Sequence, residues 1–386
     1  MADKALQSKY ASFVAYGVAN PREESFGEVT TSKNNVNYVY RRMNLRIDMG
    51  EGRQSYVQLM GGYDKKDATI RRPAVAVANQ PTEFLTIPWD KRFDEAMVSQ
   101  VANYSKISVN LTDTNYDNTK SFLSELDAIE EMEKAFTTVD DQGNTTFKQI
   151  PVRVTGDIEY RTYNGETTRN FNLRTIRVMT DKDKQEKYRM ELHQTYIIGD
   201  KSFSRNFEDE LVEKGSTIVA AYVPQYISKQ DGKVVKKVLP LPYAFTIRAK
   251  EGSKAVDVIN QFIKPNDEDI ALEADLIIDS FDGYEKVQGE IEITDDLQSL
   301  IDAGFLTEEE LKKQMTASGR RIHEDFFKGP MIVNQKVSVN PRYDISVLDT
   351  GIVEAKDIPN NHIDFGDDDD SSSDSSDDLD IADIFG

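Results

Sequence analysis

The chain has 386 residues, a net charge of −21 and no cysteine, which excludes disulfides, thiolate metal sites and cysteine nucleophiles. It has no apolar run of the roughly 18 residues that a membrane helix needs, and its first ten residues lack the apolar core of a signal peptide, so we expect a cytoplasmic protein without a membrane partner. The histidines His193, His323 and His362 are far apart and show no HExxH-type spacing, which argues against a histidine metal site.

The negative charge is unevenly distributed along the chain. Residues 151–250 hold 18 Lys or Arg against 13 Asp or Glu, whereas residues 251–363 carry −13 and residues 364–386 carry −10. Because sign asymmetry is informative where the total charge is not, a local basic surface for a polyanion is compatible with this acidic chain.

Residues 1–140 are predicted to form an N-terminal β-rich domain, which could itself be OB-like. Alternation over 38–49 places aliphatic side chains on one strand face, namely Val39, Met43, Leu45, Ile47 and Met49. The opposite face is aromatic and basic, and a return strand follows the turn at 50–52. A helix is expected over 118–136, with a domain boundary near 140–145.

Aromatic and basic side chains that alternate on a strand suit single-stranded nucleic acid, because bases stack on aromatic rings and cations neutralise phosphates. The alternative is an ordinary solvated face, since tyrosine is common in strands. Trp89, beside Lys91 and Arg92, is either a stacking platform or a partly buried packing residue. The candidate DNA-binding residues of this region are Tyr38, Tyr40, Arg42, Arg46, Tyr56 and Trp89.

Residues 145–250 are predicted to form an OB-like barrel. Five strands in about 100 residues, with a short helix near 206–213, match the element count of that fold, and Asn164-Gly165 indicates a hairpin turn. The basic residues of these strands favour a groove that follows a phosphate backbone, although surface charge in several directions is the alternative. The candidate DNA-binding residues here are Arg153, Arg161, Tyr163, Arg169, Phe171, Arg174, Arg177, Lys187 and Arg189.

The C-terminal third is acidic. Residues 251–363 are predicted to be a mixed α/β region, with helices over 255–263 and 307–315. Residues 364–386 hold ten Asp and no Lys or Arg, so we expect a disordered tail. Its tip is apolar and acidic, which is typical of a docking peptide. The candidate partner-binding residues are Asp380, Ile381, Asp383, Ile384 and Phe385.

The motifs of common enzymes are absent. The sequence has no GxxxxGK[ST] loop, no GxGxxG after a strand and no GxSxG elbow. We therefore predict no catalytic residue, no cofactor and no metal site. Scattered carboxylates leave a metal-dependent nuclease open as an alternative.

The overall pattern resembles single-stranded DNA-binding proteins of bacteria and bacteriophages. The tail of the bacterial family ends in acidic residues, Ile-Pro and a terminal Phe; here Ile384-Phe385 matches in kind, the proline is absent and Gly386 follows. The chain is longer than a bacterial single-domain member, which favours a phage protein with two barrels.

The resemblance implies a mainly β fold with some helix (α+β), with OB-fold-like barrels and a disordered acidic tail. It implies a non-enzymatic protein of DNA replication, recombination or repair that binds single-stranded DNA without sequence preference. Replication or recombination proteins would be recruited through the tail, and a homo-oligomer is compatible with this function. The main alternative is a structural or virion β protein whose tail serves solubility or assembly.

Overall fold

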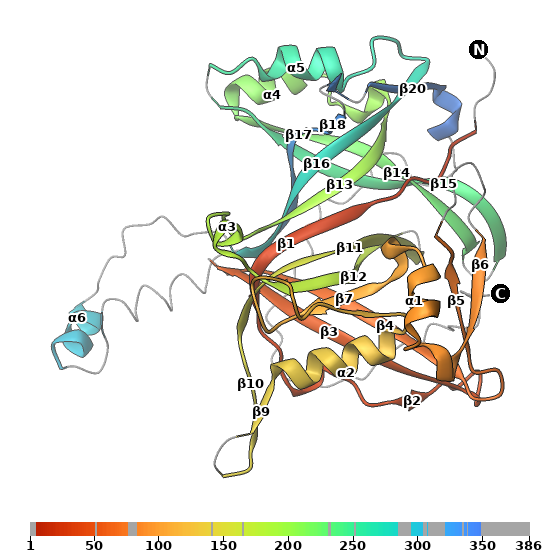
Figure 1. The fold of residues 1–386 in the computed structure, drawn as a ribbon. Coiled ribbons are helices and arrows are strands. Elements are labelled where there is room, and N and C mark those ends of the chain that lie inside the picture. Colours follow the sequence, from red (N-terminus) through yellow and green to blue (C-terminus); the bar gives the residue numbers. More distant parts are fainter. Residues whose placement is uncertain are drawn as a thin grey trace.

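The computed structural model is mainly β, with one large mixed sheet of 14 strands and short helices around it (Figure 1). It describes residues 5–50, 52–75, 83–139, 142–163, 166–230, 233–250, 252–284, 295–303, 307, 321–333, 336–337 and 339–348. The predicted tail over 364–386 lies outside these residues, as does the helix expected over 307–315 apart from Thr307.

Five strands of the N-terminal half pair in a closed circuit, which we call the first ring. They are β1 (Ser12–Ala19), β3 (Tyr38–Gly50), β4 (Arg53–Asp64), β11 (Ile150–Tyr163) and β12 (Glu166–Val178). β1 is antiparallel to both β3 and β11, β3 to β4, and β11 to β12. A parallel pairing of β4 with β12, at Gln58 and Asn172, closes the circuit.

The second ring repeats this order of pairing. Its strands are β13 (Arg189–Ile198), β14 (Ser216–Gln230), β15 (Lys233–Arg248), β16 (Ile270–Tyr284) and β17 (Arg321–Pro330). β13 is antiparallel to β14 and β16, β14 to β15, and β16 to β17, while β15 and β17 are parallel at Thr246 and Phe326.

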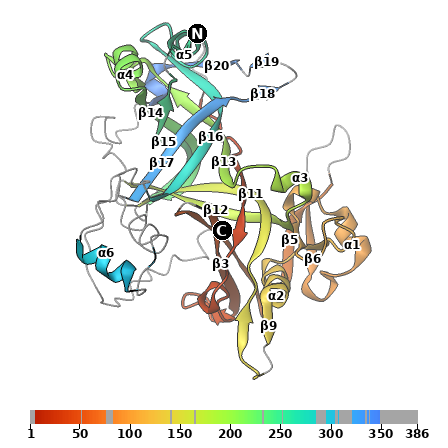
Figure 2. The same ribbon diagram turned by 90° about the vertical axis from the view of Figure 1, so that its left-hand side faces the viewer.

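The two rings are joined edge to edge. β1 and β13 pair antiparallel, from Ser12 opposite His193 to Tyr16 opposite Arg189. The second ring therefore stands above the first in both views (Figures 1 and 2). The strands of both rings thus belong to one continuous sheet, and the two rings meet along the β1–β13 pairing.

Helices connect the corresponding strands of each ring. In the first ring α2 (Glu125–Phe136) follows β4, and in the second α5 (Ala255–Phe262) follows β15. The Ser124 hydroxyl accepts a hydrogen bond from the Leu126 amide and caps α2. The core side of α2 holds Leu126, Ala128, Ile129, Met132 and Phe136, all buried. The apolar spacing of 3.6 residues thus positions this helix against the ring.

The remaining strands extend the sheet or form small pairs. β2 (Thr30–Thr31), β7 (Ile107–Asn110), β8 (Lys120–Phe122) and β20 (Val339–Asp344) extend it. The small pairs are β5 (Thr69–Pro73) with β6 (Phe84–Pro88), β9 (Thr137–Val139) with β10 (Thr145–Phe147), and β18 (Ile332–Val333) with β19 (Lys336–Val337).

Short helical segments fill the connections. The α-helices are α1 (Glu95–Gln100), α3 (Asp181–Lys184), α4 (Phe207–Glu213) and α6 (Asp295–Asp302). The 3-10 turns are η1 (Glu23–Ser25), η2 (Trp89–Lys91), η3 (Asn103–Ser105), η4 (Asp200–Ser202) and η5 (Ile345–Leu348).

The strand alternation predicted from the sequence determines the core. The five aliphatic residues expected on the inner face of β3 are all buried, while Arg42 and Asn44 are exposed. Tyr40 departs from the alternation and is buried. The helices expected over 206–213 and 255–263 appear as α4 and α5, whereas the helix expected over 118–136 begins only at Glu125 because residues 120–122 pair as β8.

The rings divide the chain differently from the sequence prediction. The predicted boundary near 140–145 falls inside the first ring, because β11 and β12 close on β1, β3 and β4. The passage between rings lies at 179–188, around α3. Local alternation identifies strands but contains no information on pairings between positions more than 100 residues apart.

Candidate nucleic-acid interface

A shallow, open groove with a volume of about 570 Å³ lies where the connection between the rings meets the second ring. We call it the junction groove. It is lined by Gln185, Glu186, Lys187, Arg189, Arg248, Asp279, Phe326, Phe327 and Lys328. Four of these nine side chains are cationic and two are aromatic, in a chain whose net charge is −21.

The connection that supplies part of the groove is held by a capped turn. The Thr180 hydroxyl accepts from the Asp183 amide, and the Asp183 carboxylate accepts from the Thr180 amide, so α3 starts with a capping box. Hydrogen bonds from Thr180, together with nearby Arg177, hold the pKa of Asp183 below its ordinary value despite partial burial. The chain leaves α3 as an exposed segment over 184–187 and enters β13 at Arg189.

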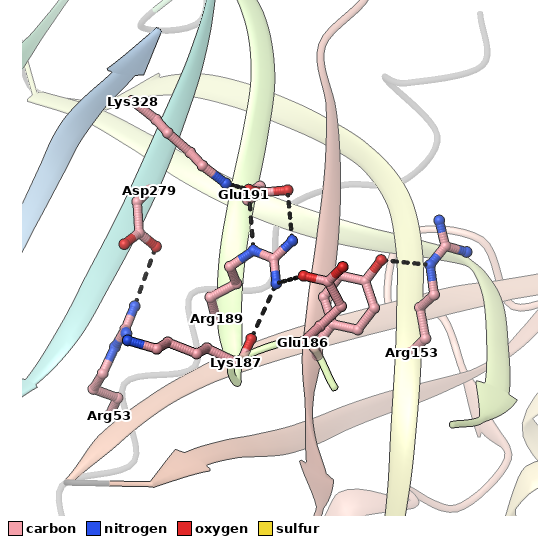
Figure 3. Close-up of polar contacts among 9 residues, drawn as sticks. Arg53, Arg153, Glu186, Lys187, Arg189, Glu191, Asp279 and Lys328 are labelled. Carbon is pink, nitrogen blue, oxygen red and sulfur yellow. Dashed lines mark hydrogen bonds and ion pairs between the residues drawn. The ribbon is translucent and has the colours of Figure 1, made fainter. Parts of the chain in front are cut away.

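Arg189 is the centre of an ion-pair network on one wall of the groove (Figure 3). It pairs with Glu186 at 2.9 Å and with Glu191 at 3.0 Å. Lys328 on β17 contacts the same Glu191 carboxylate. The guanidinium groups of Arg189 and Arg153 both lie over the Tyr16 ring, at 4.8 and 5.7 Å from its centroid. Two cations therefore share one carboxylate, and two share one aromatic ring.

The opposite side of the network is built from β4 and β16. Arg53 of the first ring pairs with Asp279 at 3.2 Å, and its guanidinium lies 4.7 Å from the Phe281 ring centroid. Burial raises the pKa of Asp279, even though Arg53 and Arg189 oppose the shift. Burial, followed by the charge of Arg189, lowers the pKa of Lys328, although that lysine contacts Glu191. Burial is thus the main cause of both shifts, and the charge of Arg189 adds only to that of Lys328.

Arg248 and Phe326 also line the groove. The Arg248 guanidinium is 3.6 Å from the Phe326 ring centroid, its side chain is 62% exposed, and its contact with Glu324 is long at 3.9 Å. Phe326 is itself buried and in edge contact with Phe281. Arg248 is therefore available at the surface in a defined position.

Three of the residues predicted from the sequence come together around this network: Arg153, Lys187 and Arg189 (Figure 3). Lys187 is exposed, and it has no hydrogen-bond or ion-pair partner for its side chain within the part of the chain that the structure describes. The excess of Lys and Arg over residues 151–250 thus includes two predicted residues that line the groove, Lys187 and Arg189.

The predicted residues of β3 and β4 lie on another surface of the first ring. Arg42 and Tyr56 are exposed, Arg46 is paired with Asp48 at 2.6 Å, and Tyr38 stacks on the buried Tyr40 with ring centroids 6.3 Å apart. Trp89 is half-buried; it stacks on Tyr63 at 4.2 Å and carries the Arg92 guanidinium at 4.2 Å.

Most other predicted arginines are engaged in ion pairs. Arg161 pairs with Glu159 at 3.2 Å, Arg174 with Asp157 at 2.6 Å, and Arg177 with Asp183 at 3.3 Å.

Two predicted residues lie inside the molecule rather than on a basic face. Arg169 is buried between the rings in a pair with Asp325, and Phe171 is partly buried with its ring against Phe13. The side chain of Tyr163 and the tail residues Asp380, Ile381, Asp383, Ile384 and Phe385 lie outside the described parts.

Sequence reasoning missed Arg53, Arg248, Asp279 and Lys328. The only local signal was for Arg53, which directly follows the turn predicted at 50–52 and begins the return strand. The other three come from β15, β16 and β17, and only the ring closure brings them to the groove.

Comparison with protein-family models, with curated proteins and with solved structures found no match to this chain. None of the helices described is long and apolar enough to cross a membrane. Among the described residues, no three His, Asp or Glu side chains gather in a way that could hold a metal ion.

Proposed function

We propose that this chain binds single-stranded DNA without sequence preference, with the junction groove as the principal contact, and that each ring is an OB-type barrel. The support for the fold is that each ring is a closed circuit of five strands in the same order, with a helix between its third and fourth strands. The OB fold is a five-stranded Greek-key barrel that binds oligonucleotides.

The observation that carries the proposal is the gathering of Lys187, Arg189, Arg248 and Lys328 in one groove of a strongly acidic protein. A polyanion is the natural ligand of such a surface, because its phosphates displace counterions when they meet Lys and Arg. An open groove admits an extended single strand, and the exposed Arg248 guanidinium, held over the buried Phe326 ring, offers a planar group on which a base can stack.

The acidic tail extends this proposal. Residues 364–386 would compete with DNA for the cations and recruit replication or recombination proteins through Ile381, Ile384 and Phe385. A bacteriophage source and action in the cytoplasm of the host cell belong to the same proposal.

Fluorescence anisotropy of a labelled oligo(dT) tests the proposal. We expect binding that weakens steeply with salt, by a slope of about 0.7 in log K per phosphate contact, and little difference between oligo(dT) and mixed single-stranded sequences. Lys187→Gln should weaken binding, while Lys254→Gln, an exposed lysine outside the groove, serves as the charge-matched control. Ordinary non-specific binding has a Kd of about 1–100 μM. The proposed function would be overturned if the protein showed no salt-sensitive binding with a Kd below about 10 μM.

A further inference from the structure

The side chains of Arg53 and Lys187 point toward one another across the junction of the two rings (Figure 3). Arg53 begins β4 of the first ring, and Lys187 belongs to the segment that leads into β13 of the second. Figure 3 shows the Lys187 side chain extended toward the Arg53 guanidinium. Two cations that point toward one another repel, so this arrangement favours an anion between them.

Arg53 is held in place by its surroundings. Its side chain is 15% exposed, it pairs with Asp279, and it lies over the Phe281 ring. Gly283 permits the close approach of β16, since a Cβ at that position would be 2.9 Å from the Arg53 Cα. The guanidinium is therefore oriented before any ligand arrives, which reduces the entropy lost on binding.

Part of the donor capacity at this point is unused. The Arg53 Nε atom is buried and has no hydrogen-bond partner within the described residues. Lys187 likewise has no side-chain partner among them. Arg189 and Lys328 are, in contrast, already paired with Glu186 or Glu191. Because the Nε atom itself is closed to solvent, a phosphate oxygen would instead accept from Lys187 and from the exposed part of the Arg53 guanidinium, whose side chain is 15% exposed.

We propose that Arg53 and Lys187 together bind one phosphodiester group of the nucleic acid and thereby connect the two rings through the ligand. This inference rests on the proposed function and assigns its first phosphate subsite. The planar guanidinium presents donors in a fixed fork, and the lysine adds a mobile point charge. Lys187, on the exposed connection, is the part that closes on the phosphate, whereas Arg53 is already fixed.

Sharing of one phosphate has a measurable consequence. If two cations meet the same group, removing either one loses most of the contact, and removing both costs little more. If they meet different phosphates, their losses add. The test is therefore a double-mutant cycle with Arg53→Gln, Lys187→Gln and the double variant, using labelled oligo(dT) over a range of salt concentrations.

We expect each single variant to weaken binding by about fivefold and to lower the salt slope by about 0.7. The affinity of the double variant should lie within about twofold of the affinity of the weaker-binding single variant. Its salt slope should equal that of the single variants. Lys254→Gln, the charge-matched control outside the groove, should leave both quantities unchanged.

The outcomes separate this inference from the proposed function. If the wild-type protein does not bind oligo(dT), the function itself is overturned. If it binds and the losses of the two single variants add in the double variant, or if neither variant differs from Lys254→Gln, the shared subsite is overturned and the function stands. Should Arg53→Gln melt well below the wild type, Arg53→Lys replaces it, since lysine keeps the charge and loses the fork; the same non-additivity with Lys187→Gln is then expected, and additive losses refute the subsite.

Discussion

Arg169 of β12 and Asp325 of β17 form an ion pair at 2.5 Å that joins the first ring to the second, and each side chain is only 4% exposed. Arg169 also donates to the Ser280 hydroxyl at 3.0 Å, and its guanidinium lies 4.9 and 5.0 Å from the ring centroids of Phe171 and Tyr243. The coulombic attraction of Asp325 raises the pKa of Arg169 well above its ordinary value against the effect of burial. This buried pair therefore joins the two rings in addition to the β1–β13 pairing.

Breaking this pair should destabilise the protein strongly. Asp325→Ala leaves a buried guanidinium without a counter-charge, which costs about 3–5 kcal/mol. Urea unfolding followed by circular dichroism measures the loss. The matched control is Arg174→Ala, whose pair with Asp157 is 33% and 22% exposed and should contribute about 0–1 kcal/mol. Equal losses in the two variants would show that the pair does not hold the rings together.

Glu191 should limit the affinity of the groove for DNA. Its carboxylate pairs with Arg189 and contacts Lys328, so both cations are partly neutralised before DNA arrives. Glu191→Gln should therefore tighten binding of oligo(dT) several-fold and steepen the salt slope, by about 1.4 if two more phosphate contacts form. Anisotropy titrations at several salt concentrations measure both.

Glu159→Gln is the control for Glu191, because Glu159 pairs with Arg161 and does not line the groove. It removes the same charge from the molecule and should change affinity by less than about twofold through the general field, which salt screens. An equal gain in the two variants would mean that net charge, rather than the Glu191 pairs, controls binding.

The sequence predicted local structure well where one strand or helix carries its own pattern. The alternation of Leu45 and Ile47 with polar neighbours placed the core face of β3, and the apolar spacing over 126–136 placed α2. The closure of the rings was not predictable in this way. Gln58 and Asn172 meet in a parallel pairing 114 positions apart, and nothing near either residue in the sequence identifies the other.

The candidate site was predicted in part for the same reason. The basic balance of residues 151–250 led to Arg153, Lys187 and Arg189, which do meet. The same excess of basic residues also led to the prediction of Arg169 as a surface residue. The strand pattern around Arg169 does not reveal that Asp325, 156 positions away, neutralises it in the core. A charge count describes a whole region of the chain. Whether one arginine of that region lies at the surface or in a buried ion pair depends on tertiary contacts.

The affinity for DNA should begin to fall at a lower pH than it would if every lysine of the groove had the ordinary pKa of an exposed lysine. Burial and the charge of Arg189 lower the pKa of Lys328, so this ammonium loses its proton at a lower pH than an exposed lysine. Below that pKa the cation is present and attracts phosphate; as the pH rises through it, the attraction is lost. Affinity for oligo(dT) measured upward from pH 8 should therefore fall in the wild type.

Lys328→Arg separates this effect from other titrations, because a guanidinium stays protonated throughout the range. The variant should retain its affinity where the wild type loses it. A parallel decline in both proteins would assign the pH dependence to another group and remove Lys328 from the binding surface.

The exposed face of β4 should provide base stacking beyond the groove. Tyr56 is 46% exposed and stands opposite Arg46 in the β3–β4 register, so a ring and a cation are presented side by side. A base stacked on this ring would contribute about 1–3 kcal/mol, and Tyr56→Ala should therefore weaken binding of oligo(dT) by about fivefold or more. Tyr56→Phe keeps the ring and should restore most of the affinity. Tyr104, which is 67% exposed on η3, is the control for loss of a surface tyrosine; if Tyr104→Ala weakens binding as much as Tyr56→Ala does, stacking on this face is refuted.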